Sequence, residues 1–361
     1  MQKEKDIRQA EERVLSQQQI LDEKQRAKNL EHYLLNERKK YREAEREPKL
    51  LILGSSDAGK STFLKQLKIL HGSGFTDQEI TAAKQNAIQQ VITVSELILQ
   101  NGDDNIKSKY SGISQFLNLS EGPYDALPLA VIKCMSKLWE DPDVQCLCKE
   151  LKHLIPESSD KFFKNIRNIG SIEYRMTNEE ILLLRVVTQV ISETIFQVKN
   201  VNFHFYDVSG LTHHRKHWIP YFEHVLGVIF LVDISAYDRN LAENPEVNRL
   251  VDALNLFNEI VNHKLLANAS MMLFFNKKDL FEVKTSEVYI KDYFPDYTGR
   301  VGSASDGGRY FHKKFFDLIK NKSKTVDAHF TCCTDTNLIK KVSDNLLESV
   351  IQISLKRSEL V

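Results

Sequence analysis

Apolar residues occur in two patterns along this 361-residue chain. Short apolar runs are typical of strands buried in a parallel sheet, and apolar residues three or four positions apart mark helix faces. The predicted strands are 50–53, 195–198, 202–206, 227–233, 271–275 and 328–332. The helices predicted between them are 62–70, 215–226, 244–262, 308–320 and 337–356. Strands that alternate with helices predict a mostly parallel, doubly wound α/β sheet.

A long block without strand pattern interrupts this alternation between residues 76 and 180. Thr76 and Glu79 form the capping box of a predicted helix that runs to Gly102. Its apolar face consists of Ile80, Ala83, Ala87, Val91, Val94 and Ile98. Further helices are predicted at 130–138, 144–154 and 160–169. The pattern therefore predicts an all-α block, 73–181, inserted into an α/β domain made of 49–72 and 182–361.

Residues 1–48 are rich in Gln, Glu, Lys and Arg and contain no Gly. Ile7, Val14 and Leu21 recur every seven positions, which predicts a long N-terminal helix with one apolar seam. Either this helix is fully solvated, or a partner covers the seam. The length of the segment favours a docking helix.

Composition narrows the environment in which the protein works. Lys+Arg and Asp+Glu both number 49, so the net charge favours neither nucleic acid nor an anionic membrane as a partner. The five cysteines lack zinc-type spacing, and their odd number argues against a disulfide framework. We therefore expect a reducing, intracellular compartment. No apolar run is long enough to span a bilayer.

The strand at 50–53 leads directly into a glycine loop and a helix. Gly54, Gly59, Lys60 and Ser61 satisfy the pattern G-x-x-x-x-G-K-[ST]. Such a loop wraps phosphates with its backbone N–H groups, while the lysine reaches the β and γ phosphates and the serine reaches Mg²⁺. An ordinary glycine loop is the alternative, but the flanking strand and helix argue against it. The predicted phosphate-binding residues are Gly54, Ser55, Ser56, Asp57, Ala58, Gly59, Lys60, Ser61 and Thr62.

Two further polar segments follow predicted strands. Asp207 ends the strand 202–206 and begins D-V-S-G, which reaches Gly210, so its carboxylate is expected near Ser61 and able to hold Mg²⁺ through water. Asn276-Lys277-Lys278-Asp279 follows the strand 271–275. An aspartate at this point accepts two hydrogen bonds from guanine, and adenine offers no such donor pair. Each segment alone resembles an ordinary turn, but all three in this order predict a guanine-nucleotide site.

These segments and their surroundings carry a family resemblance from about Lys49 to the C-terminus. The sequence resembles the α subunits of heterotrimeric G proteins in NPEVNRLVDALNLFNEI, LFFNKKDLF and HFTCCTDT, and in its helical insertion. The resemblance implies a Ras-like P-loop GTPase fold, GTP or GDP as the bound nucleotide, and Mg²⁺ as cofactor.

The resemblance also assigns residues that no local pattern identifies. Ser158 in the helical insertion is expected to face the nucleotide, as are Leu183 and Leu184. Arg185 matches the arginine that stabilises the γ-phosphate in cis, and Thr188 matches the threonine that completes the Mg²⁺ shell with Ser61. The residues expected to contact the guanine base are Thr331, Cys332 and Cys333.

The chain departs from the family pattern at the second switch. It has D-V-S-G-L-T where the family has D-V-G-G-Q-R, so Leu211 replaces the glutamine that orients the attacking water. Leucine cannot hydrogen-bond to water, and slow hydrolysis is therefore expected. Ser209 replaces a glycine there. Arg215, followed by Trp218, matches the family's helix that reads out the γ-phosphate, and Asp252 lies where an acidic partner for that arginine is expected.

The resemblance implies partners as well. A βγ dimer is expected on a surface formed by the N-terminal helix and the helix of the second switch that carries Trp218. A receptor is expected on residues 337–361, where Leu360 keeps the apolar penultimate position. The effector is unknown. Gln2 stands where N-myristoylation requires a glycine, and no early cysteine is present for palmitoylation. We therefore expect attachment to the cytoplasmic face of the plasma membrane through partners.

The leading hypothesis from the sequence is a signalling switch that binds GTP·Mg²⁺ and GDP, with impaired hydrolysis. The first alternative is a normal GTPase in which His213 or a regulator positions the water. The second is a non-hydrolysing, GTP-bound scaffold that acts through partner binding alone.

Overall fold

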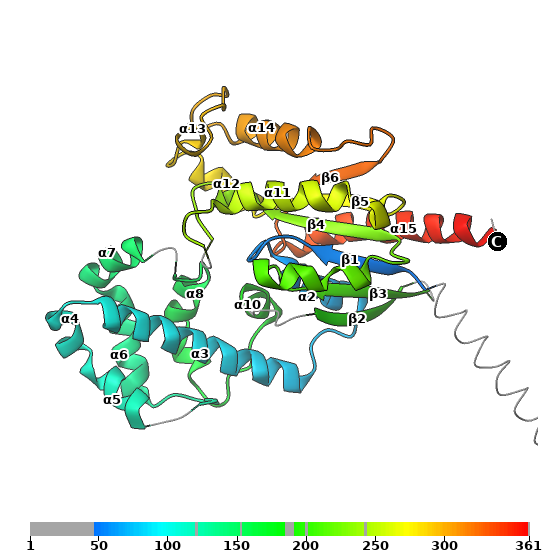
Figure 1. Cartoon of the computed structure of the whole chain (residues 1–361). Coiled ribbons are helices and arrows are strands. Elements are labelled where there is room, and N and C mark those ends of the chain that lie inside the picture. Colours follow the sequence, from blue (N-terminus) through cyan, green and yellow to red (C-terminus); the bar gives the residue numbers. More distant parts are fainter. Residues whose placement is uncertain are drawn as a thin grey trace, which may run out of the picture. The chain divides into compact units, whose positions relative to one another are not determined.

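Six strands form one sheet at the centre of the unit made by residues 48–356 (Figure 1). The computed structural model describes residues 47–119, 122–151, 154–184, 191–198, 201–241 and 244–359. The strands are β1 Lys49–Leu53, β2 Ile191–Val198, β3 Val201–Val208, β4 Gly227–Asp233, β5 Ser270–Asn276 and β6 Val326–Phe330. Their order is β2-β3-β1-β4-β5-β6, and the β2–β3 pair alone is antiparallel. The predicted mostly parallel sheet is confirmed.

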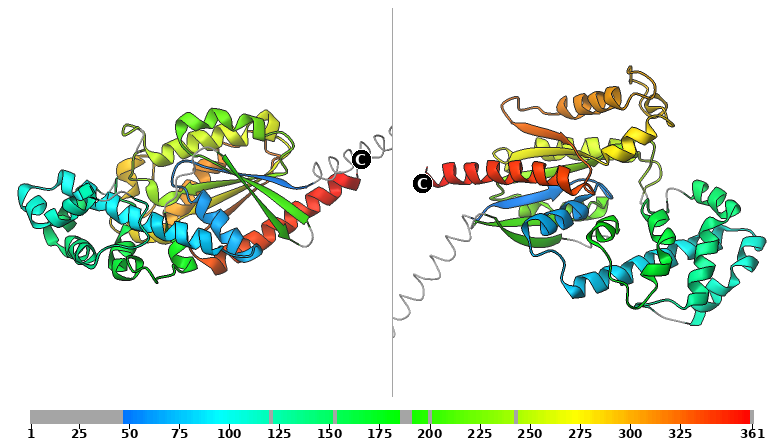
Figure 2. Two further views of the ribbon diagram at one scale, coloured as in Figure 1. Left: turned by 90° about the horizontal axis from the view of Figure 1, so that it is seen from below. Right: turned by 180° about the vertical axis from the view of Figure 1, so that it is seen from behind.

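Helices cover both faces of this sheet. α11 (Arg249–Val261) and α14 (Ala304–Phe316) lie on one face, and α2 (Lys60–His71) and α15 (Thr336–Glu359) lie on the other (Figure 2, left). All seven residues of β4 are buried, as expected for a strand covered on both sides.

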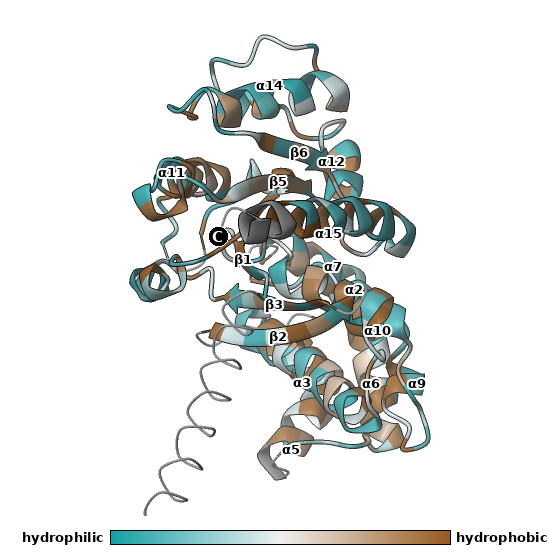
Figure 3. Ribbon diagram, turned by 90° about the vertical axis from the view of Figure 1, so that its right-hand side faces the viewer, coloured by the Kyte–Doolittle hydropathy of each residue, from teal (hydrophilic) through white to brown (hydrophobic). Residues whose placement is uncertain are grey.

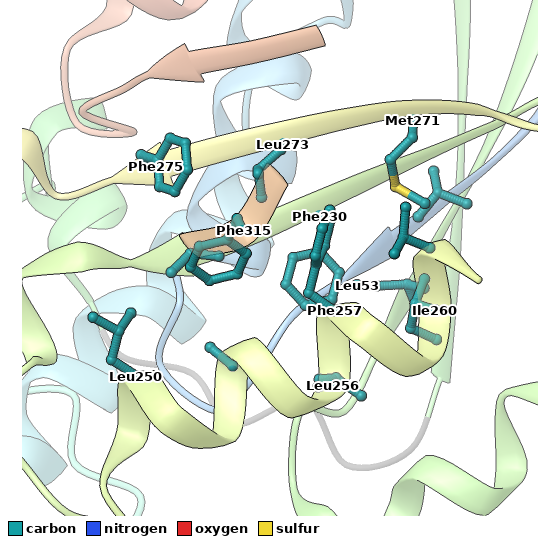
Figure 4. Close-up of a cluster of buried hydrophobic side chains, with 14 of the residues drawn as sticks. Leu53, Phe230, Leu250, Leu256, Phe257, Ile260, Met271, Leu273, Phe275 and Phe315 are labelled. Carbon is teal, nitrogen blue, oxygen red and sulfur yellow. The ribbon is translucent and has the colours of Figure 1, made fainter. Parts of the chain in front are cut away.

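Successive residues of a strand therefore contribute side chains to two separate hydrophobic cores, one on each face of the sheet. Phe230 of β4 packs against Phe257 of α11, with ring centroids 5.2 Å apart (Figure 4). On the opposite face, Phe63 of α2 meets Phe274 of β5 edge to face at 5.4 Å. The side-chain period of two in the strands produces this division.

Shorter elements complete the part of the fold around the sheet. They are α12 Lys278–Lys284, α13 Ile290–Tyr293, and the 3₁₀ segments η1 Thr212–His217, η2 Ile219–Tyr221, η3 Ile234–Ala236 and η4 Lys264–Leu266.

The predicted insertion forms a helical block with a core of its own. Its helices are α3 Asp77–Asn101, α4 Asp104–Lys109, α5 Ser111–Leu119, α6 Leu129–Glu140, α7 Pro142–Glu150, α8 Ser159–Lys164, α9 Ile166–Ile169 and α10 Asn178–Leu183. The capping box of α3 is present, because Glu79 N–H donates to Thr76 Oγ1 and Thr76 N–H donates to Glu79. All six residues of its predicted apolar face are buried. The ribbon of α3 in Figure 3 alternates between hydrophilic and hydrophobic colours along its length, as an amphipathic helix should.

The predicted helix 215–226 is wrong. The segment forms the 3₁₀ turns η1 and η2 instead. Pro220 has no N–H to donate to an α-helical bond, and His224 adopts a left-handed φ of 61°, which no helix continues. The apolar spacing of Trp218, Phe222 and Val225 resembles that of a helix face. The three side chains are indeed buried, but the backbone between them is not α-helical.

Several predicted boundaries also shift for local reasons. α11 begins at Arg249 rather than 244, because the side chain of Asn248 caps the N–H groups of Leu250 and Val251. α14 begins at Ala304, before the glycine pair, because the side chain of Ser303 caps the N–H group of Asp306. The predicted helix 160–169 is interrupted at Asn165, and 144–154 is the shorter α7.

Some predictions fall outside the described residues. They are the N-terminal helix with its apolar seam, Arg185, Thr188 and Leu360. In the part of the chain that is described, none of the helices has the length and apolar character needed to cross a membrane.

Candidate functional site

A cavity of about 390 Å³ lies where the loop after β1 meets the loops after β3, β5 and β6 and the start of α8. The carboxyl ends of parallel strands are the usual ligand-binding edge of such sheets. Segments far apart in the sequence, including parts of the helical block, therefore line one site.

The loop after β1, which is predicted to bind phosphates, forms one side of this cavity. Its residues 56–62 line the cavity, whereas Gly54 and Ser55 lie behind and accept hydrogen bonds from Lys60 Nζ at 3.0 and 2.8 Å. Gly59 has φ +100°, and a Cβ there would lie 2.2 Å from Asn276 Nδ2. The loop can therefore close against the guanine-type motif only with glycine at this position.

The burial of the Lys60 ammonium group favours an anionic ligand in this cavity. Its side chain is buried, and burial lowers its pKa to about 8, an effect that Asp207 and Asp57 only partly oppose. A buried ammonium at the N-terminus of α2 lacks full compensation in the protein alone. Phosphate groups in the cavity would supply the missing negative charge.

Oxygen donors suited to Mg²⁺ meet next to this loop. Ser61 Oγ donates to Asp207 Oδ2 at 2.9 Å, and the Asp207 carboxyl at the end of β3 is 2% exposed. A hydroxyl and a carboxylate are ligands that Mg²⁺ prefers, so this pair fits the ion once phosphate oxygens are added. The described residues contain no group of three or more His, Cys, Asp or Glu able to hold a metal by themselves.

Asn276 joins the phosphate side to the base side. Its Nδ2 donates to Ala58 O at 2.8 Å, and its Oδ1 accepts from Cys333 N–H at 3.0 Å and Thr331 Oγ1 at 3.4 Å. Thr331 is fully buried and does not line the cavity, whereas Cys332 and Cys333 do. One amide thus fixes three loops relative to each other.

Lys277 and Asp279 face the same cavity from the start of α12. Lys277 is in the left-handed region, with φ 58°. The Asp279 side chain is exposed and lies at the cavity, which leaves its carboxylate in a position to accept from a base.

The second switch lies against Lys60. A Cβ at Gly210 would lie 2.6 Å from the backbone C and O atoms of Ser55 and 2.5 Å from Lys60 Nζ, and the fixed backbone of Ser55 means that only glycine allows this approach. Arg215 donates to both oxygens of Asp252, at 2.8 and 2.6 Å, and to Gly210 O at 3.3 Å. The structure therefore brings together the predicted pair. Leu211 lines the cavity beside Gly210.

The segment around Trp218, which was predicted to form part of the βγ surface, buries its tryptophan. Its side chain is 2% exposed and belongs to the core between the sheet and α11. The exposed apolar residues of this segment are Ile219 and Tyr221.

The helical block supplies a third wall. Ser158 lines the cavity and accepts a hydrogen bond from Gln90 Nε2 at 3.0 Å. Leu183 and Leu184 line it from the end of α10, where Lys65 Nζ of α2 donates to Ile181 O and Leu184 O at 2.9 Å.

Sequence reasoning missed several polar residues of the cavity. These are Glu157, Lys161, Arg239 and Arg249. Arg249 Nη1 lies 3.4 Å from Asp57 Oδ2, and Glu157 pairs with both Arg239 and Lys277. No local sequence pattern marks such contacts, because each joins segments distant along the chain.

Fold and site together define a P-loop protein that binds guanine nucleotides and carries an inserted helical block. Residues 24–350 match the family model described as G-protein alpha subunit. The chain is similar to the guanine nucleotide-binding protein alpha-3 subunit of Caenorhabditis elegans, at 35% identity over 316 residues that cover 85% of this chain and 89% of the relative. The chain belongs to the G-protein alpha subunit family, whose members are generally GTPases that transduce signals.

Proposed function

We propose that this α subunit alternates between GTP·Mg²⁺ and GDP and hydrolyses GTP slowly. The observation that carries the proposal is the connection made by Asn276, which places the N-K-K-D loop and the phosphate loop around one cavity. The proposed domains are 49–72 with 182–361 for the nucleotide, and 73–181 for the inserted helices.

Each wall of the cavity has its own role in this proposal. Residues 56–62 hold the phosphates, and Gly54 and Ser55 support them from behind by accepting from Lys60. Asn276, Lys277 and Asp279 hold guanine together with Cys332 and Cys333, and Thr331 acts through its hydrogen bond to Asn276. Ser61, Asp207 (through water) and Thr188 hold Mg²⁺. When bound, that ion neutralises negative charge on the phosphates.

We attribute slow turnover to the side chains proposed to lie next to the γ-phosphate. Arg185 stabilises the charge that develops there, and Gly210 offers a backbone N–H. Leu211 offers no hydrogen bond to the attacking water. His213, the alternative water-orienting residue, has an exposed side chain, whereas His214 is the histidine bonded to Ser209, at 2.9 Å between Nδ1 and Oγ.

The nucleotide that remains bound after purification tests this proposal most simply. Denaturing the full-length protein and chromatographing the released nucleotide should yield guanine nucleotide. Adenine nucleotide, or none, would contradict guanine recognition. A GTP fraction would favour a state locked with GTP, whereas GDP alone would favour turnover and exclude a scaffold that never hydrolyses GTP.

A scaffold that never hydrolyses GTP is the second candidate. The apolar side chain of Leu211 at the cavity favours it. Single-turnover phosphate release from preloaded GTP separates the two functions, because slow hydrolysis gives a measurable rate above that of free GTP and a scaffold gives none.

For partners we propose a βγ dimer on the N-terminal helix and the second switch, a receptor on residues 337–361, and an effector of unknown identity. Such partners would place the protein at the cytoplasmic face of the plasma membrane. A truncation that begins near Pro48 should lose co-purifying βγ dimer. Undiminished recovery would rule out the N-terminal segment as a docking element.

A further inference from the structure

Four charged side chains form a continuous ion-pair chain at the base side of the cavity. Arg239 Nη1 lies 2.7 Å from Glu157 Oε1, and Glu157 Oε2 lies 3.1 Å from Lys277 Nζ. Lys277 Nζ also lies 2.8 Å from Asp233 Oδ2. Lys277 belongs to the N-K-K-D loop, but no motif accounts for the other three residues.

The ion-pair chain is largely withdrawn from water. The side chains of Asp233, Arg239, Lys277 and Glu157 are 5%, 16%, 20% and 30% exposed. Burial would raise the pKa of Glu157, but Lys277 and Arg239 lower it to about 2. Burial would lower the pKa of Lys277, but Asp233 and Glu157 raise it above its ordinary value. Both groups are therefore charged at neutral pH.

Asp233 is fixed independently of this contact. It ends β4, and its Oδ1 accepts from Ser235 N–H at 3.0 Å and from Ser235 Oγ at 2.6 Å. Its second oxygen is thereby directed at Lys277. The carboxylate thus determines where the Lys277 ammonium lies.

The ion-pair chain crosses between two parts of the fold. Glu157 precedes α8 in the helical block, whereas the other three residues belong to the part built on the sheet. The loop after β4 approaches α8 (Figure 1). The chain itself joins the two parts elsewhere, between α2 and α3 and after α10. Glu157, Arg239 and Lys277 all line the cavity, so the contact lies at its edge.

We propose that Arg239 and Asp233 are positioning residues that slow nucleotide release by holding Glu157 and Lys277 together across the edge of the cavity. The inference rests on the guanine-nucleotide binding proposed above. Separating the helical block from the sheet at this edge requires breaking two ion pairs of Glu157. Removing one partner of a partly buried pair changes dissociation more than association.

The direct test is the release of fluorescent methylanthraniloyl-GDP from the full-length protein, chased with excess GDP. Arg239→Gln should release the nucleotide about tenfold faster, with the association rate nearly unchanged. Arg239→Lys should restore much of the slow release, because it keeps the charge. Arg309→Gln is the matched control: Arg309 also pairs with a carboxylate, that of Asp306, but lies on α14 outside the cavity.

A double-variant cycle tests whether Arg239 acts through Glu157. In a Glu157→Gln background, Arg239→Gln should have little further effect on release. An equal acceleration in both backgrounds would overturn the proposal. Asp233→Asn, which preserves side-chain shape, supplies a second and independent variant and should also accelerate release.

The outcomes for the two proposals remain distinguishable. A wild-type protein that binds no GDP would contradict the guanine-nucleotide function itself. A protein that binds GDP, but whose release is unchanged in both Arg239→Gln and Asp233→Asn, would contradict the role of the ion-pair chain and leave guanine binding intact. Unchanged thermal unfolding of the variants excludes general destabilisation as the cause of faster release.

Discussion

The two ends of the nucleotide cavity are built differently. At the base end, Asn276 is 2% exposed and satisfied by three partners from two other loops, and Lys277 is held by two carboxylates. At the γ-phosphate end, Gly210 lies close to Lys60, but the neighbouring side chain is the apolar Leu211. The base end is thus built from polar side chains that hold one another in place, whereas the end at which we propose that the γ-phosphate binds has an apolar side chain beside its glycine.

The largest expected effect comes from repairing the γ-phosphate end. Gα enzymes with an arginine in cis hydrolyse GTP at about 10⁻² s⁻¹. Loss of one preorganised polar contact to a transition state typically costs about 10²–10³-fold. We therefore expect a wild-type rate on the order of 10⁻⁴ to 10⁻⁵ s⁻¹ and an acceleration of about 10²–10³-fold in Leu211→Gln. Single-turnover phosphate release from preloaded GTP measures both.

Leu211→Met is the control for that experiment. Methionine has a similar volume and cannot orient water as an amide does, so the rate should stay at the wild-type value. If the wild-type chain already hydrolyses as fast as Leu211→Gln, another group positions the water and the two ends do not differ in the way described.

The next largest effect is expected at the base end. Asp279→Asn removes a charged acceptor for guanine, which should cost about 2–3 kcal/mol, or roughly 30–150-fold in GTP affinity. Selectivity should relax toward xanthine nucleotides. Equilibrium titration with GTP and XTP measures both changes. Glu282→Gln, an exposed charge one turn further along α12, should leave both affinities unchanged. Unaltered GTP affinity in Asp279→Asn would show that this loop does not read the base.

The sequence was sufficient for the sheet and for the site segments at its edge. Unbroken apolar runs such as 227–233 require burial on both faces, and glycine spacing in 54–61 requires a tight loop before a helix. These signals are local, because a strand period, a glycine position and a cap each act within a few residues. The six strands and the capping box of α3 were predictable for that reason.

The remaining features depend on tertiary contacts. The segment 215–226 has helical apolar spacing, but Pro220 and the packing of Trp218 decide its actual conformation. Glu157 and Arg239 pair only because the helical block closes toward the loop after β4. The resemblance placed Ser158 near the nucleotide, but neither pattern nor resemblance indicated its charged neighbour.

The smallest effect that we expect is a pH dependence of GDP affinity, which arises at the phosphate end and not at the base end. Burial lowers the pKa of Lys60 to about 8 in the free protein, and bound phosphates favour the charged ammonium, so the pKa rises in the complex. GDP affinity is therefore highest well below pH 8, where Lys60 is already protonated in the free protein, and falls as the pH rises through that value. GDP affinity should fall about fourfold between pH 7 and pH 8.5. Lys60→Arg, which stays charged throughout, should bind with a flatter pH dependence even if its affinity is lower.

Asp279→Asn turns this measurement into a test of the comparison between the two ends. Its weaker binding arises at the base, whereas the pH dependence arises at the phosphates. The variant should therefore show the same fourfold fall between pH 7 and pH 8.5 from a lower starting affinity, with about one proton taken up per GDP bound at high pH. Calorimetry in buffers of different ionisation enthalpy measures this uptake. A flattened profile in Asp279→Asn would mean that the two ends are coupled, because only then could a change at the base alter how Lys60 titrates.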